Sequence, residues 1–133
     1  MNDVLRRNRN RTAILLFHGY IADDGRFTVV GKQMFDLVVK PNPNVRLILC
    51  GHVCGTGYRE DDLDDTGDGV PDRRVSAMLY NYQEYGIDTG QLRVLTFDPA
   101  SHGLTVLTYS PPLKRYFRDS YFSSAEFTIH GAF

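Results

Sequence analysis

Residues 45–55 read VRLILCGHVCG, an apolar stretch that stops at a glycine followed by a histidine. Residues 14–20, ILLFHGY, also form an apolar run that stops at a histidine beside a glycine. Short continuous apolar runs of this kind predict strands that are buried on both faces of a sheet. The last side chain of such a strand has a fixed place at the carboxyl edge of the sheet, where open α/β sheets collect their binding groups. The two stretches therefore predict neighbouring strands that end at His18 and His52.

The segment between the two strands predicts a helix. Apolar residues recur at helical spacing between Val29 and Lys40, and the prolines at positions 41 and 43 end the helix. A strand, helix and strand in this order are joined by a right-handed crossover, so the two strands are expected to be parallel.

The character of the sequence changes after His52. Gly55 to Asp72 is acidic and contains glycines, which predicts a long loop. Three further strands are predicted, at Arg74–Tyr82, Leu92–Asp98 and Leu104–Ser110, and the turn between the last two suits an antiparallel hairpin. Residues 111–133 are aromatic and irregular, and we expect them to wrap over the sheet with a short edge strand at Phe127–Ile129. The predicted fold class is α/β: a mixed sheet with one crossover helix, followed by an antiparallel meander.

Length and composition exclude several classes of protein. The chain has 133 residues, which suits a single domain over residues 1–133, and its formal net charge is −1. This charge gives no electrostatic reason to expect nucleic acid or an anionic membrane as a partner. No segment approaches the roughly 20 apolar residues of a membrane span, and no signal peptide is recognised. Two cysteines do not make a disulfide framework, so the sequence leaves the localisation open.

His18 and His52 are the first candidates for chemistry. A single histidine at a strand end often has a structural role, but two at matching ends of parallel strands can converge on one ion. Neutral imidazole suits zinc, iron and manganese, and a catalytic site would need further ligands, usually carboxylates. Asp23 and Asp24 are the nearest carboxylates in the sequence, although solvation at the surface explains them equally well.

Five blocks of sequence, taken in order, resemble the carboxyl-terminal half of calcineurin-like metallophosphoesterases. The blocks are HGY at 18–20, NPNVRLILCGHVCG at 42–55, MLYNYQ at 78–83, QLRVLTFDP at 91–99 and LTVLTYSP at 104–111. The resemblance implies half of a sandwich of two packed sheets flanked by helices. It also implies a site for two divalent transition metals (Mn, Fe or Zn) that hydrolyses phosphomonoesters or phosphodiesters.

The resemblance assigns roles to three residues. His18 matches a single histidine that serves as a metal ligand in the family, and Gly51 to Cys54 match a final Gly-His-x-His block. His18 and His52 would then serve one metal, and position 54 would serve the other. Cys54 stands where the family has a histidine, and it is either a thiolate ligand or a buried apolar residue.

Three blocks of the family are absent from this sequence: Asp-x-His, Gly-Asp-x-x-Asp and Gly-Asn-His. They would supply the bridging carboxylate and the histidine that assists the leaving group. We therefore interpret the chain as a truncated phosphoesterase that is inactive by itself. Its expected partners are a phosphoester substrate and either the missing amino-terminal half or a second copy of the chain.

A second candidate site lies in the acidic segment. Asp64, Thr66, Asp68 and Asp72, with Gly69, resemble the calcium loops of thrombospondin-type repeats, in which alternate oxygen donors converge on an ion. Seven acidic residues between Glu60 and Asp72 are expected to repel one another and to leave the loop mobile without calcium. A solvated turn explains the same residues. The alternative function is thus a non-catalytic binding or interaction module that calcium could stabilise.

Overall fold

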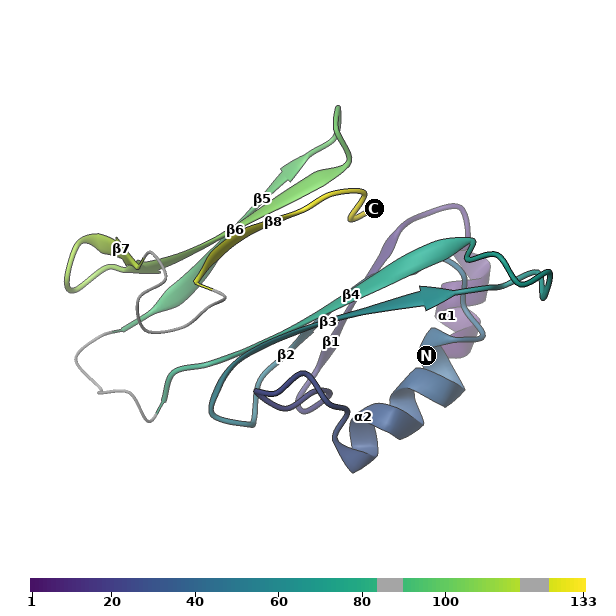
Figure 1. Ribbon diagram of the computed structural model, residues 1–133, viewed down its shortest axis with the longest axis horizontal. Coiled ribbons are helices and arrows are strands. Elements are labelled where there is room, and N and C mark those ends of the chain that lie inside the picture. Colours follow the sequence, from purple (N-terminus) through teal and green to yellow (C-terminus); the bar gives the residue numbers. More distant parts are fainter. Residues whose placement is uncertain (84–89, 118–124) are drawn as a thin grey trace.

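The first part of the chain forms a four-stranded mixed sheet (Figure 1). The computed structural model describes residues 1–83, 90–117 and 125–133. In spatial order the strands are β1 (Ala13–Phe17), β2 (Val45–Cys50), β4 (Arg73–Asn81) and β3 (Gly55–Leu63). The first three are parallel, and β3 runs antiparallel to β4. The predicted parallel pairing of β1 with β2 is confirmed, in a register that sets Phe17 beside Cys50.

Helices cover one face of this sheet. They are α1 (Asn2–Arg7), α2 (Val29–Met34) and its continuation η1 (Phe35–Val39), a π-helical turn in which the amide of Lys40 donates to the carbonyl of Phe35. The Thr28 hydroxyl caps α2 by accepting from the amide of Gly31 at 2.9 Å. The predicted crossover helix is therefore confirmed. Within the described part of the chain, no helix has the length and apolar character that crossing a membrane requires.

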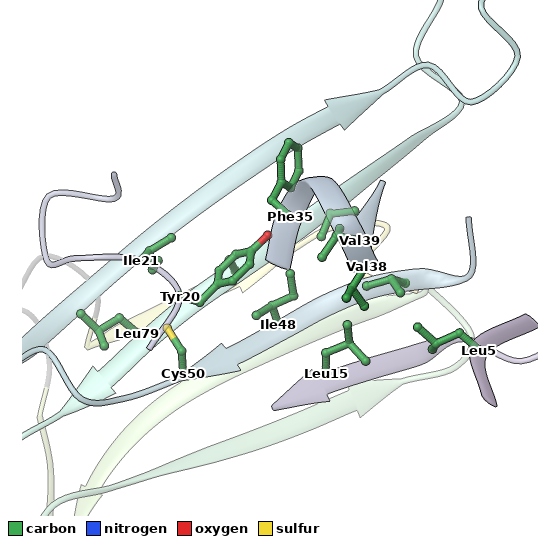
Figure 2. Packing of buried hydrophobic residues seen from close by; sticks show 13 residues of the cluster. Leu5, Leu15, Tyr20, Ile21, Phe35, Val38, Val39, Ile48, Cys50 and Leu79 are labelled. Carbon is green, nitrogen blue, oxygen red and sulfur yellow. The ribbon is translucent and has the colours of Figure 1, made fainter. Parts of the chain in front are cut away.

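Figure 2 shows the core between the helices and the sheet. Leu15, Ile48 and Leu79 from the strands pack against side chains of η1 and of the segment after β1. The buried residues of α2 and η1 are Gly31, Phe35, Val38 and Val39, whereas Val30 and Leu37 are exposed. Helical spacing therefore predicted the helix, but two of the apolar residues that suggested it face solvent. Full burial of each aliphatic side chain in this core contributes roughly 1.5–3 kcal/mol.

A second, antiparallel sheet packs against the other face over β2, β4 and β3. It leaves β1 uncovered on this side, where Leu16 is 75% exposed, so the prediction that β1 is buried on both faces is wrong. The second sheet contains β5 (Leu92–Asp98), β6 (Gly103–Ser110), β7 (Arg115–Phe117) and β8 (Glu126–Ile129). The predicted β5–β6 hairpin and the short strand at the end of the chain are confirmed, and β8 pairs with β6. Leu47 and Met78 from the first sheet meet Leu104, Val106 and Ile129 from the second in a separate core. Residues 118–124 of the predicted covering tail lie outside the described residues.

The prediction of a loop from Gly55 to Asp72 is wrong over its first half. Residues Gly55–Leu63 form β3, which pairs with β4 along its whole length. Arginines offset the negative charge: Arg59 binds Asp61, and Arg74 on β4 binds Glu60 and Asp62 across the strands. Opposite charges on paired strands stabilise the sheet, so the acidic run does not prevent strand formation.

Candidate functional site

The two histidines lie side by side at the carboxyl edge of the mixed sheet. His18 follows the last residue of β1, and His52 follows β2 after Gly51. The amide of Gly51 donates to the carbonyl of His18 at 3.1 Å, so the segments that follow β1 and β2 remain hydrogen-bonded just beyond the strands. Adjacent parallel strands that end in register thus bring the two side chains to one place.

The imidazole rings of His18 and His52 are in contact. Their centroids are 4.5 Å apart, with an angle of 49° between the ring planes, and both residues are exposed. The predicted convergence of the two side chains is confirmed. Metal–imidazole bonds are about 2.0–2.1 Å long, so two rings at this separation are within the span of one shared ion. The pair thus places two imidazole rings at one solvent-accessible position.

The backbone at His52 adopts a left-handed conformation. Its φ is +68°, which is uncommon for a residue with a side chain and costs on the order of 1 kcal/mol or more. The side-chain amide of Asn81, at the end of β4, donates to the His52 carbonyl at 3.0 Å. The amide of Val53 donates to the carbonyl of Gly51 at 2.9 Å. These bonds hold the turn that places the His52 ring beside His18.

The sequence gives no signal for the role of Asn81, because 29 positions separate it from His52. The contact exists only because β4 lies next to β2 in the sheet.

Cys54 is half-buried, and its thiol donates to the backbone carbonyl of Asn81 at 3.8 Å. Both cysteines are free. Burial raises the pKa of the other thiol, Cys50, which favours its protonated form. Among residues 1–83, 90–117 and 125–133, no group of three His, Cys, Asp or Glu side chains is placed to hold a metal. The structure thus brings His18 and His52 together without a third ligand, and ligation by Cys54 stays a prediction.

Asp23 and Asp24 are exposed on the loop after β1. A carboxylate oxygen of Asp24 accepts from the amide of Arg26 at 2.9 Å. Both aspartates line a shallow pocket with Glu60 and Tyr58 of β3. Within the described part of the chain, neither aspartate joins the two histidines in a group of three that could hold a metal ion.

The carboxylates of the acidic loop accept hydrogen bonds from the loop itself. Asp64 accepts from the amides of Gly67 and Gly69 at 2.6 and 2.7 Å. Asp72 accepts from the amides of Asp65 and Thr66 at 2.7 and 2.9 Å. The amide of Val70 donates to Asp68 in the same way. These bonds define the conformation of the loop, and calcium binding there stays a prediction.

Asp64 should titrate below the usual range of an aspartate. The amides of Gly69 and Gly67 hold the pKa of this carboxyl below its usual value of about 3.9. A lowered pKa in the folded state means that the charged form stabilises the loop above the unfolded pKa. This contribution is lost as the pH falls through the folded value.

We expect a carboxyl-detected NMR titration to place the Asp64 midpoint below that of an unfolded peptide. Asp64→Asn should increase amide exchange at Gly67 and Gly69. A midpoint at or above about 3.9 would show that these bonds do not form in solution.

Comparison with known proteins finds a similar protein in a bacterium. The chain is 44% identical over 134 residues to the uncharacterized protein YvnB of Bacillus subtilis (strain 168), and the match covers 97% of this chain. The same match covers 10% of YvnB, so the chain spans about a tenth of the length of this curated relative. No family model matches the chain, and no solved structure matches it.

Proposed function

We propose that this chain forms part of a metal-dependent phosphoesterase centre of the calcineurin-like type, in which His18 and His52 bind one divalent transition metal. The observation that carries the proposal is the contact of the two imidazole rings, 4.5 Å apart at the ends of neighbouring parallel strands. Two histidines held by a sheet edge match the histidine pair that the sequence blocks imply. Manganese, iron and zinc all accept neutral imidazole.

The described residues fit such a metal as two of its ligands. Both rings are exposed, so the remaining positions of the ion are open to water, to a phosphate oxygen or to ligands from outside this chain. In a two-metal phosphoesterase, the ions bind the phosphate oxygens and lower the pKa of the attacking water. The contribution of this chain is to hold the two imidazoles at a fixed place for that ion.

Metal binding tests the proposal. The chain should be dialysed against zinc or manganese, and the bound metal measured by elemental analysis. His18→Ala and His52→Ala should each weaken binding by about tenfold or more, since each removes a direct ligand. His102→Ala is the matched control, because His102 is also exposed but lies on the β5–β6 turn. Equal metal binding by wild type and by both ligand variants would contradict the proposal.

The chain by itself should not hydrolyse phosphoesters. The sequence lacks the blocks that would bridge two metals, and the described residues hold no group of three ligands. We expect turnover of an aryl phosphate with added manganese, zinc or iron to stay far below the typical enzyme value of about 10 per second. Turnover near that value that is abolished by His18→Ala would show that this segment is catalytically complete.

A further inference from the structure

Residues 51–53 form a three-residue turn of a rare type. The amide of Val53 donates to the carbonyl of Gly51 at 2.9 Å, and the central residue, His52, has a φ of +68°. A hydrogen bond of this span around a φ near +75° is the pattern of the γ-turn with positive φ, which is rare and strained. Glycine adopts a positive φ without this strain, yet a histidine stands at the centre of the turn. A strained residue of this kind persists only where its surroundings hold it.

The side chain of Asn81 holds this turn from another strand. Its amide nitrogen donates to the His52 carbonyl at 3.0 Å, and its amide oxygen accepts from the amide of Gln83 at 3.1 Å. A backbone carbonyl only accepts and a backbone amide only donates, so these two bonds fix which end of the carboxamide faces His52. Aspartate has the same shape as asparagine, but its ionised carboxylate has no donor for the His52 carbonyl.

The turn sets the direction of the His52 side chain. The imidazole lies against that of His18, with ring centroids 4.5 Å apart. A Cβ on Gly19 would be 3.6 Å from both the Cβ and the Cδ2 of His52, so the same side chain also lies beside the residue that follows His18. A change of φ at His52 to the usual negative range would turn its Cα–Cβ bond relative to the flanking chain. Such a change would withdraw the ring from His18.

We propose that Asn81 is a positioning residue of the proposed metal site: its bond to the His52 carbonyl holds the strained turn, and the turn keeps the His52 imidazole beside that of His18. The effect on metal affinity rests on the proposed function, whereas the placement of the ring can be measured in the metal-free chain. A ligand that is already in place loses less conformational freedom when an ion binds. Loss of the Asn81 bond should therefore weaken metal binding although Asn81 itself does not contact the ion.

The zinc affinity of Asn81→Ala tests the effect on the site. The variant should bind zinc about tenfold more weakly than wild type, which is the lower end of the effect of residues that orient metal ligands. Asn44→Ala is the matched control, because the Asn44 side chain also donates to backbone carbonyls, in and after α1. Asn44 precedes β2, whereas His52 follows it. Asn44→Ala should lower the melting temperature but leave the zinc affinity unchanged.

The placement of the ring is tested by NMR in the metal-free chain. Wild type should give nuclear Overhauser contacts between the rings of His18 and His52, and Asn81→Ala should lose them. Asn81→Asp should lose them too, although it keeps the shape of the side chain and the bond to Gln83. The added charge of Asn81→Asp would itself attract zinc, so this variant is compared only without metal. Asn44→Ala should keep the contacts.

The two measurements separate the positioning role from the proposed function. Zinc affinity or ring contacts of Asn81→Ala equal to those of wild type would overturn the positioning role, and so would an equal loss of affinity in Asn44→Ala. If wild type bound no zinc through His18 and His52, the proposed function would fail. In that case, ring contacts retained by Asn81→Ala would still overturn the positioning role, and their loss would support it.

Discussion

Replacing Gly31 with alanine is expected to destabilise the protein by about 3 kcal/mol or more, which is a large part of the stability of a typical domain. A Cβ at this position would lie 1.8 Å from the carbonyl oxygen of Tyr20 and 2.6 Å from its carbonyl carbon. Both are backbone atoms, and Tyr20 is fully buried. The amide of Thr28 also donates to this carbonyl at 3.0 Å, and this bond limits how far the carbonyl can move away from the helix. Helix α2 would have to move away from the Tyr20 backbone.

The sign of this effect makes the test decisive. In an exposed helix interior, Gly→Ala stabilises by about 1 kcal/mol, because alanine has the higher helix propensity. Denaturant unfolding of Gly31→Ala should therefore be compared with Val29→Ala, on the exposed side of the same helix. Val29→Ala should change the free energy of unfolding by no more than about 0.5 kcal/mol. Wild-type or higher stability of Gly31→Ala would show that α2 does not approach Tyr20 this closely.

Replacing Arg73 with methionine is expected to cost about 3–5 kcal/mol. The Arg73 side chain is buried, and its guanidinium binds Asp65 at 2.6 Å. It also donates to the carbonyl of Val45 at 3.0 Å and to the carbonyls of Val39 and Lys40 at 3.2 Å. The last two belong to the carboxyl end of η1, where carbonyls lack partners within the helix. One side chain thus ties the acidic loop, the start of β2 and the end of the crossover helix together.

Its neighbour Arg74 provides the matched control. Arg74 binds Glu60 and Asp62, but its side chain is about half exposed, and such surface pairs contribute roughly 0–1 kcal/mol. In chemical denaturation, the free energies of unfolding of Arg73→Met and Arg74→Met should therefore differ by several kcal/mol. Similar midpoints for the two variants would mean that the Arg73 contacts are not formed in solution.

Apolar periodicity predicted the elements whose buried residues form a continuous apolar run or recur at helical spacing. The strands at β1 and β2, the crossover helix and the β5–β6 hairpin all follow from runs and spacing of apolar residues. β3 was missed because it contains three consecutive acidic residues, Glu60, Asp61 and Asp62, whose charge is offset by Arg59 on the same strand and by Arg74 on the neighbouring strand. Such pairing across strands depends on the register of the sheet, which single-strand patterns do not reveal.

The sequence likewise predicted one part of the candidate site and missed another. His18 and His52 were predicted to meet because each ends a strand, and their convergence needs only the parallel pairing of those strands. Asn81 could not be predicted, since its bond to the His52 carbonyl depends on the position of β4.

The most direct test of the central claim is a zinc titration followed in NMR spectra of the histidine ring nitrogens. The account predicts that the ring signals of His18 and His52 shift together and stop changing at one zinc per chain. The rings of His102 and His130, which are also exposed, should stay unchanged over the same range. Unchanged signals of His18 and His52, or equal shifts of all the histidines, would contradict a shared metal site at the carboxyl edge of the sheet.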